Sequence, residues 1–220
     1  MPQLSHRKRI YADIHSRILR GEVSPDDRLV DTVIAAEMGV SRMPVREALM
    51  QLVSEGYLEG TSRGFTLPNL GHDRILEVFV LRRLLEPHAA ASAAQARTDA
   101  ELAAMRSALD TTSSAMETGD FETFHRASEV FRNAWLAAVP NLELRHSIQR
   151  YSGQVQMVRL ATMRNSDARR TIVEGQREQL DAFNNRDGVA AGVLLLRFVF
   201  EGERSYLRLR ATASEPEGIS

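Results

Sequence analysis

The chain has 220 residues, with 28 lysines and arginines against 29 aspartates and glutamates and a formal net charge of −1 at pH 7. Because the charges balance, a basic surface for nucleic acid must be local. The absence of cysteine excludes disulfides, thiolate metal sites and cysteine nucleophiles. No apolar run approaches the roughly 20 residues of a membrane span, and the start of the chain lacks the apolar stretch of a signal peptide, so we expect a cytoplasmic protein.

Two short helices are predicted first along the chain. An apolar stripe with i, i+4, i+8 spacing from Ile10 to Ile18 predicts a helix that ends at Gly21. Asp31 has a side chain suited to the N-cap of a second helix. Gly39 is placed for the left-handed turn that ends this helix.

A third helix follows at once and carries two arginines on one face. Ser41 is a natural N-cap, and Pro44 lies in the first turn, where its missing N–H costs little. Arg42 and Arg46 are four residues apart and therefore share a face. The N-terminal turn of such a helix presents donors to base edges and phosphates, and a guanidinium can pair bidentately with guanine.

A two-stranded wing is predicted after the third helix. Residues 57–59 and 65–67 are short strand segments on either side of a Gly/Ser/Arg turn. Arg63 at the turn can enter the minor groove or pair with the DNA backbone, and Gly64 permits the tight turn. We therefore expect a winged helix-turn-helix.

The same residues carry a family resemblance. The matching segments are Gly39-Val-Ser-Arg-Met-Pro-Val-Arg-Glu-Ala-Leu49, Leu52, Glu55-Gly56-Tyr57-Leu58, Arg63-Gly64 and, upstream, Ile18, Gly21, Pro25, Arg28 and Leu29. This combination resembles the GntR family of winged-helix regulators over residues 10 to 68. The resemblance implies a homodimer on double-stranded operator DNA, contacted through Ser41, Arg42, Pro44, Arg46, Arg63 and Gly64. Arg28 either touches phosphate or pairs with Asp31. The alternative is that the arginines are solvated surface charges.

The rest of the chain is predicted to be all helical. Strand signals vanish after Pro68 and helical periodicity takes over. Short breaks separate six expected helices, near residues 71–95, 98–118, 120–139, 141–164, 168–185 and 187–210. Short connections favour an antiparallel bundle. The fold class is therefore mainly α, with a DNA-binding domain at residues 1–70 and a helical domain at residues 71–220.

A second, looser resemblance covers most of residues 71–205. Its marks are Leu81-Arg82-Arg83-x-Leu85-Glu86-Pro87 with Ala89 to Ala94, Gly119-Asp120, Asn141-x-x-Leu144, and Asp181-Ala182-Phe183 with Asp187. They resemble the ligand-sensing FCD domain of the FadR-like branch of the GntR family, which implies effector binding and dimerisation. Many such domains bind a divalent metal through one Asp and three His. The register places Ser128, Arg132, Gln176 and Phe198 at those positions, so we expect no metal cofactor.

Periodicity also predicts a pocket in the helical domain. Three apolar stripes each contain a polar residue, namely Arg82, Ser128 and Gln176, and Arg132 lies beside the second stripe. Because a buried polar group needs a partner, we expect these groups to bind an acidic ligand directly, with a guanidinium paired to a carboxylate. An apolar part of the ligand would be covered by Phe124, Phe131, Trp135, Tyr151 and Phe198. The structural alternative pairs Arg82 with Glu86, and Arg132 with Glu129 or solvent.

The predicted function is a DNA-binding transcriptional regulator, with repression as the expected sign, whose operator affinity is modulated by a small carboxylate effector. One alternative is a regulator whose helical domain only dimerises. Another is an enzyme in the helical domain, but the sequence contains no Gly-rich phosphate loop, no His-Glu-x-x-His and no Gly-x-Ser-x-Gly. We therefore expect no enzymatic activity.

Overall fold

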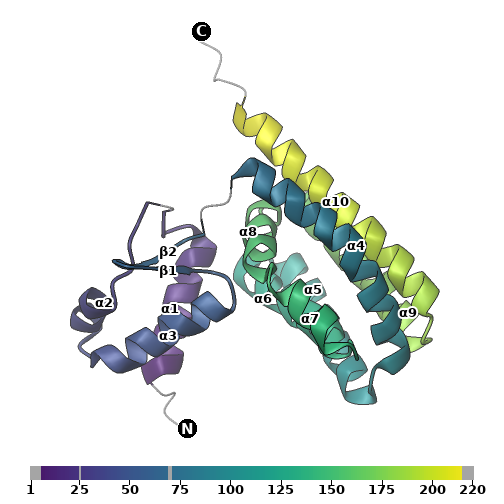
Figure 1. The fold of residues 1–220 in the computed structure, drawn as a ribbon, viewed down its shortest axis with the longest axis horizontal. Coiled ribbons are helices and arrows are strands. Elements are labelled where there is room, and N and C mark those ends of the chain that lie inside the picture. The colour runs from purple at the N-terminus through teal and green to yellow at the C-terminus, as the bar shows by residue number, and fades with distance from the viewer. Residues whose placement is uncertain (1–5, 25, 69–70, 215–220) are drawn as a thin grey trace. The chain divides into compact units, whose positions relative to one another are not determined.

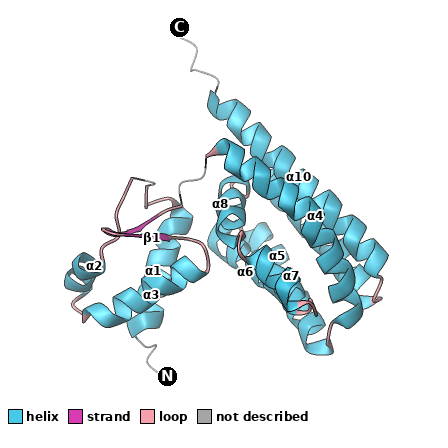
Figure 2. Cartoon of the chain, in the orientation of Figure 1, coloured by secondary structure: helices cyan, strands magenta, loops and turns pink. Residues whose placement is uncertain are grey.

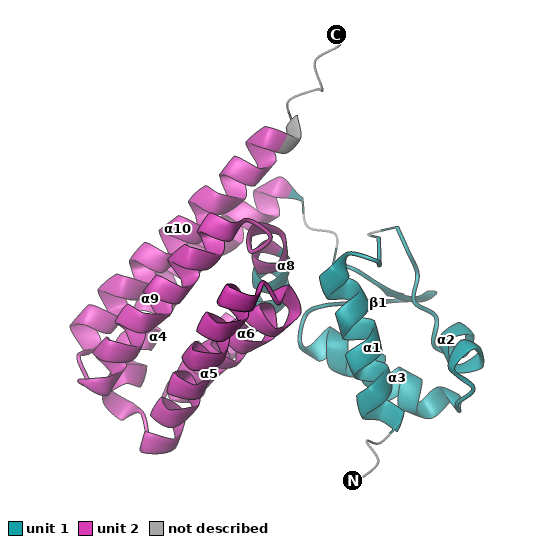
Figure 3. Ribbon diagram, turned by 180° about the vertical axis from the view of Figure 1, so that it is seen from behind, with its two compact units in different colours: residues 1–71, 151–157 teal, residues 72–150, 158–220 magenta. Residues whose placement is uncertain are grey.

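The computed structural model describes residues 6–24, 26–68 and 71–214 (Figure 1). Helices make up most of this part, and its strands form one short hairpin (Figure 2). The chain divides into two compact units, residues 1–71 with 151–157 and residues 72–150 with 158–220 (Figure 3). Pro25, which belongs to the sequence motif above, and residues 69–70, at the predicted domain boundary, lie outside the described residues.

Three helices form the core of the first unit, namely α1 (His6–Arg20), α2 (Asp31–Met38) and α3 (Arg42–Ser54). The predicted stripe of isoleucines on α1 is buried, and α1 packs on α3. Gly39 ends α2 with a φ of 63°, as the sequence predicts. The N-cap prediction for Asp31 is wrong: Val30 is the N-cap, and Asp31 is the first helical residue, because its carboxylate is taken by side chains of α3.

The wing consists of β1 (Glu59–Thr61) and β2 (Gly64–Thr66), paired antiparallel. The first strand begins two residues later than predicted, because Tyr57 and Leu58 are buried in the core of the unit and precede the hairpin. Gly64 adopts a φ of 130°, and a Cβ there would lie 2.8 Å from the carbonyl oxygen of Leu29. The wing therefore requires glycine at this position.

Seven further helices are described, and they belong to the second unit, except that residues 152–157 at the start of one of them belong to the first. They are α4 (His72–Ala96), α5 (Asp99–Thr118), α6 (Phe121–Ala137), α7 (Leu142–Gln149), α8 (Ser152–Thr162), α9 (Ser166–Asn184) and α10 (Gly188–Ser214). The prediction of one helix over residues 141–164 is wrong, since turns at Arg150 and Tyr151 separate α7 from α8. Gly153 follows this break, and glycine costs about 1 kcal/mol in a helix interior. None of the helices among the described residues is long and apolar enough to cross a membrane.

Helix α10 packs along α4, and α5 packs along α6 (Figure 1). Two glycines four residues apart allow α10 to approach α4 closely. A Cβ on Gly188 would lie 2.7 Å from the carbonyl oxygen of Ala91, and one on Gly192 would lie 3.0 Å from that of Pro87. The aromatic side chains of α6 and α9 fill the interior of the bundle.

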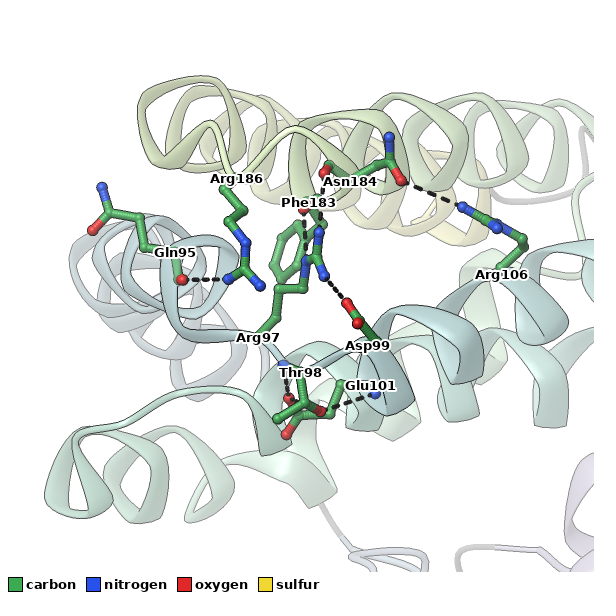
Figure 4. A network of polar contacts seen from close by, with 9 residues as sticks. All are labelled: Gln95, Arg97, Thr98, Asp99, Glu101, Arg106, Phe183, Asn184 and Arg186. Atoms are coloured by element: carbon green, nitrogen blue, oxygen red, sulfur yellow. Dashed lines mark hydrogen bonds and ion pairs between the residues drawn. The ribbon is translucent and has the colours of Figure 1, made fainter.

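Arginines join helix ends at one end of the bundle (Figure 4). The buried Arg97 donates to the carbonyl oxygens of Phe183 and Asn184, at 3.1 and 3.0 Å, and to Asp99 Oδ1 at 2.7 Å. Arg186 donates to the carbonyl oxygen of Gln95 at 2.7 Å. The last carbonyls of a helix have no partner within the helix, so these guanidiniums satisfy the ends of α9 and α4.

Candidate nucleic-acid interface and ligand pocket

One carboxylate holds both arginines of the predicted recognition helix. Asp31 Oδ2 lies 2.9 Å from Arg42 Nε and 3.2 Å from Arg46 Nη1. The Asp31 side chain is only 7% exposed, whereas those of Arg42 and Arg46 are 59% and 54% exposed. The guanidiniums therefore face solvent while their shared partner lies behind them.

The environment keeps Asp31 ionised. Burial raises its pKa, but hydrogen bonds from Arg42 and Arg46, together with the backbone N–H of Thr32, outweigh burial and leave the pKa below its usual value. The prediction that Arg28 pairs with Asp31 is wrong, because Arg42 and Arg46 occupy this carboxylate. Arg28 is exposed, which leaves phosphate contact as its remaining predicted role.

A groove of about 430 Å³ connects the recognition helix to the wing. It is lined by Val30, Asp31, Thr32, Arg42, Arg46, Met50 and residues 60–65. The structure thus brings four predicted DNA-facing residues, Arg42, Arg46, Arg63 and Gly64, to one groove.

The two other predicted DNA contacts flank the start of α3. Ser41 is the N-cap in extended conformation, but its side chain makes no capping hydrogen bond and is exposed. Pro44 lies in the first turn and is half-buried. Ser41 thus presents its hydroxyl at a helix N-terminus, where the backbone N–H groups favour an anion.

A buried ion cluster crosses the interior of the helical bundle. Glu86 on α4 accepts from Arg82 Nε at 2.9 Å and from Arg132 of α6, at 2.8 Å from Nη2 and 3.2 Å from Nη1. All three side chains are less than 9% exposed. The pairing of Arg82 with Glu86 is the one that the structural alternative predicts. Arg132 pairs with Glu86 as well and is buried, whereas that alternative pairs it with Glu129 or solvent.

The cluster shifts the pKa of its members. Burial raises the pKa of Glu86, but the charges and hydrogen bonds of Arg132 and Arg82 outweigh it and lower the pKa to about 2. Burial lowers the pKa of Arg82, and the attraction of Glu86 opposes this effect. Glu86 is therefore an anion at neutral pH, shared by two cations.

A second polar group adjoins the cluster. Ser128 Oγ accepts from Arg159 Nη2 at 2.7 Å and from Gln176 Nε2 at 3.0 Å, and all three residues are buried. Gln176 Oε1 is buried without a hydrogen-bond partner among the described residues. Ser128 lies one turn before Arg132 on α6, so the two polar groups are neighbours.

A small pocket opens beside these groups. It has a volume of about 40 Å³ and is lined by Arg82, Val158, Arg159, Thr162, Met163, Ala168, Thr171, Ile172, Phe198, Glu201, Gly202 and Ser205. Of the predicted ligand contacts, Arg82 and Phe198 are in this wall. Ser128, Arg132, Gln176 and Tyr151 are not, and Arg132 packs over the Trp135 ring at 5.6 Å.

The pocket is narrow but adjoins a wider hollow. A cavity needs roughly 10–15 Å³ to admit one water, so about 40 Å³ accepts a carboxylate group but no aromatic ring. A neighbouring hollow of about 610 Å³ shares Thr162, Ala168, Thr171 and Ser205 with the pocket. Arg164 and Arg208 also line this hollow.

The four positions that the FCD resemblance assigns to metal ligands do not suit a metal. Arg132 is a cation bound to Glu86, and Phe198 has only a hydrocarbon ring. Ser128 and Gln176 are neutral and already share a hydrogen bond. Among the described residues, no three His, Cys, Asp or Glu side chains gather in a way that would hold an ion.

Three contributors are absent from the predicted sites. Arg159 lies four residues after the buried Val155 and three before Thr162, so an apolar stripe drawn along α8 would have indicated it. Glu86 follows Arg82 by one helical turn, so the sequence indicates the pair of Arg82 and Glu86 but not the contact of Glu86 with Arg132. Asp31 is predicted from the sequence as an N-cap or a partner of Arg28, and no local pattern links it to Arg42 or Arg46, which follow it by 11 and 15 residues.

The chain matches two known families. Residues 6–66 match the bacterial regulatory proteins of the gntR family, and residues 77–199, more than half of the chain, match the FCD domain. The match to the FCD domain includes the residues of the ion cluster and most of the residues that line the small pocket, but not Glu201, Gly202 and Ser205.

Two similar proteins are named as HTH-type transcriptional regulators. The HTH-type transcriptional regulator McbR of Escherichia coli (strain K12) is 32% identical over 135 residues, which are 61% of this chain and 61% of that protein. YdhC of Bacillus subtilis (strain 168), also named as an HTH-type transcriptional regulator, is 24% identical over 82% of each chain. The solved structure of E. coli McbR/YncC superposes with a TM-score of 0.73 at 24% identity, covering 94% of this chain and 100% of that one. This superposition establishes the fold.

Proposed function

The chain belongs to the GntR family of bacterial regulatory proteins and carries an FCD domain, and on this premise we propose that it is an operator-binding repressor whose DNA affinity responds to a small organic acid. The observation that carries the DNA-binding part is the groove in which Arg42, Arg46 and Arg63 converge. A guanidinium recognises guanine O6 and N7 bidentately, and a wing arginine can contact the minor groove or phosphate.

The acid site is proposed where buried arginines meet the small pocket. Arg82, Arg132 and Arg159 are buried, and Glu86 is buried with them. Arg82 and Arg159 reach the pocket wall. An organic acid would place its carboxylate between these two arginines, in charge-assisted hydrogen bonds, and extend its remaining part past Thr162 into the wider hollow.

Arg132 takes a different role in this proposal from the one predicted. Because both of its Nη atoms are bound to Glu86, it acts as a positioning residue that fixes Glu86, which in turn fixes Arg82. Ser128 and Gln176 orient Arg159 in the same way through the Ser128 hydroxyl.

We further propose that two copies meet through the outer face of α4 and α10. Large apolar side chains are exposed along this face, namely Val80, Leu84, Val189, Val193, Phe200 and Leu207. On α10 they are spaced by four, seven and seven residues, as in the seam between packed helices. A second copy is the proposed occupant because two winged helices suit two half-sites of one operator.

The oligomeric state tests this surface. Val193→Glu would place a charge in the seam, so we expect the variant to elute as a monomer where the wild type is a dimer in size-exclusion chromatography with light scattering. Val130→Glu is the matched control, because Val130 is exposed on α6. A dimeric Val193→Glu protein would exclude this face.

The effector is tested by a thermal-shift screen of the purified full chain against organic acids and divalent metals, each with and without chelator. We expect stabilisation by an acid that survives chelator, followed by a change in operator affinity with the same acid. Stabilisation by a metal alone, abolished by chelator, would contradict the arginine pocket.

The small volume of the pocket favours a second candidate. A regulator whose helical domain only dimerises needs no cavity, and about 40 Å³ holds roughly three water-sized groups. No stabilisation by any acid, together with operator binding that no acid alters, would favour this candidate.

A further inference from the structure

Asp31 is a buried carboxylate beneath the arginines of the proposed DNA-binding surface. Asp31 binds Arg42 through Nε and Arg46 through Nη1. A guanidinium has five N–H donors. The ion pair at Nε therefore leaves the two Nη groups of Arg42, a residue that lines the groove, as further donors.

The arrangement restrains both arginines before DNA arrives. A free arginine side chain loses up to about 2 kcal/mol of rotamer entropy when it is fixed. The ion pairs with Asp31 fix the two arginine side chains when the protein folds, so this entropy is lost before DNA binds. Asp31 itself is buried in the first turn of α2, where the helix dipole also favours an anion. The guanidiniums of Arg42 and Arg46 are thus preorganised for contact with base edges.

The carboxylate also reduces non-specific attraction. Binding to any phosphate backbone depends on the number of uncompensated cations, and each phosphate contact contributes a salt-dependence slope of about 0.9. Asp31 places one negative charge against two positive ones in the groove. A phosphate that approaches the two arginines is repelled by the negative charge of this carboxylate. A base edge is neutral and is not repelled in this way.

We propose that Asp31 is a specificity-determining positioning residue, which orients Arg42 and Arg46 toward base edges and suppresses their binding to phosphate. This inference rests on the proposed DNA-binding function. It assigns the discrimination between operator and other DNA to a residue that makes no base contact itself.

The test compares two DNA duplexes and four proteins, namely the wild type, Asp31→Asn, Asp31→Glu and Asp13→Asn. The first duplex is selected by the wild-type full chain from a random-sequence library, and the second is a scrambled duplex of equal length and composition. Asp31→Asn removes the charge with little change in size. Asp13→Asn is the matched control, because Asp13 is an exposed residue on α1 of the same unit and the change in net charge is identical.

For Asp31→Asn we expect affinity for the scrambled duplex to rise about fivefold and the salt-dependence slope to steepen by about 0.9, the value of one additional phosphate contact. The ratio of the two affinities should fall about tenfold, while Asp13→Asn stays close to the wild type. Asp31→Glu restores the charge, so its salt slope should return to the wild-type value. A structural role alone would lower the melting temperature without changing the slope.

If Asp31→Asn does not fold, Asp31→Ser carries the same expectation with a smaller neutral side chain. An affinity ratio and salt slope equal to those of the wild type would overturn the role of Asp31, while leaving DNA binding intact. Failure of the wild type to enrich any sequence from the library would instead overturn the proposed function itself, so the two failures are distinguishable.

Discussion

Arg132 binds both carboxylate oxygens of Glu86 across 46 residues of sequence, at 2.8 and 3.2 Å. This bidentate pair fixes α6 against α4 in the interior of the bundle, and Arg82 adds a second cation to the same carboxylate. Breaking a buried ion pair by removal of one partner leaves an uncompensated charge. The pair therefore has measurable consequences for stability, pH dependence and ligand binding.

Glu86→Gln should lower the free energy of unfolding by about 3–5 kcal/mol, because two buried guanidiniums lose their anion. Urea unfolding followed by circular dichroism measures this loss. Glu77→Gln is the control, since Glu77 is exposed on the same helix and pairs only with the exposed Arg74, and it should cost under about 1 kcal/mol. A Glu86→Gln protein as stable as the wild type would contradict the prediction.

The stabilisation from Glu86 should disappear in acid. Its pKa falls from 4.5 to about 2 in the folded protein, so the folded state binds fewer protons than the unfolded state over this range. The contribution is therefore complete above about pH 5 and is lost as the pH falls toward about 2. Unfolding measured at several pH values should show the wild type and Glu86→Gln converging in acid. A constant difference down to about pH 2 would argue against the assigned pKa.

Arg82→Ala should weaken binding of the acid found in the screen by about tenfold to a hundredfold, the value of one hydrogen bond to a charged group. The fold should tolerate this change better than Glu86→Gln, because Arg132 still holds Glu86. Calorimetric titration gives the dissociation constant. Arg126→Ala, on the exposed face of α6, should bind as the wild type does; equal affinity of both variants would remove Arg82 from the site.

Gly64→Ala should distort the wing, because φ is 130° and the new Cβ would lie 2.8 Å from the carbonyl oxygen of Leu29. Backbone strain of this kind costs about 1–3 kcal/mol. We expect a lower melting temperature and weaker DNA binding. Gly60→Ala lies in the same hairpin with no heavy atom within 4 Å of the added Cβ, and should be tolerated. Equal behaviour of the two variants would exclude the close approach.

Arg97→Ala should destabilise the helical unit by about 2–4 kcal/mol, since the buried carbonyl oxygen of Phe183 and the partly buried one of Asn184 lose a charged donor. Thermal unfolding monitors the loss. Arg106→Ala provides the comparison, because Arg106 makes one long, exposed hydrogen bond of 3.4 Å to the side chain of Asn184, and its removal should change the melting temperature little. A larger effect at Arg106 would reverse this assignment.

Local features of the chain predict the fold class and most of the residues of the proposed interface to DNA. The isoleucine stripe of α1, Gly39 at the end of α2 and Gly64 in the wing act within a few residues of themselves, so periodicity and backbone preferences suffice to place them. Arg42 and Arg46 share a face for the same reason. Burial of Arg82, Ser128 and Gln176 also follows from their places on apolar stripes, and the structure confirms it.

Only the tertiary structure decided which of these groups meet. Asp31 and Arg46 are 15 residues apart, Glu86 and Arg132 are 46 apart, and Ser128 and Gln176 are 48 apart. Sequence periodicity determines which face of a helix is buried but not the axial shift between two packed helices, and a shift of one residue, about 1.5 Å, is half the length of a hydrogen bond. For this reason the sequence alone identified the four arginines as candidate site residues. The packing of the helices determined that Arg82 and Arg132 share Glu86, and that Arg42 and Arg46 share Asp31.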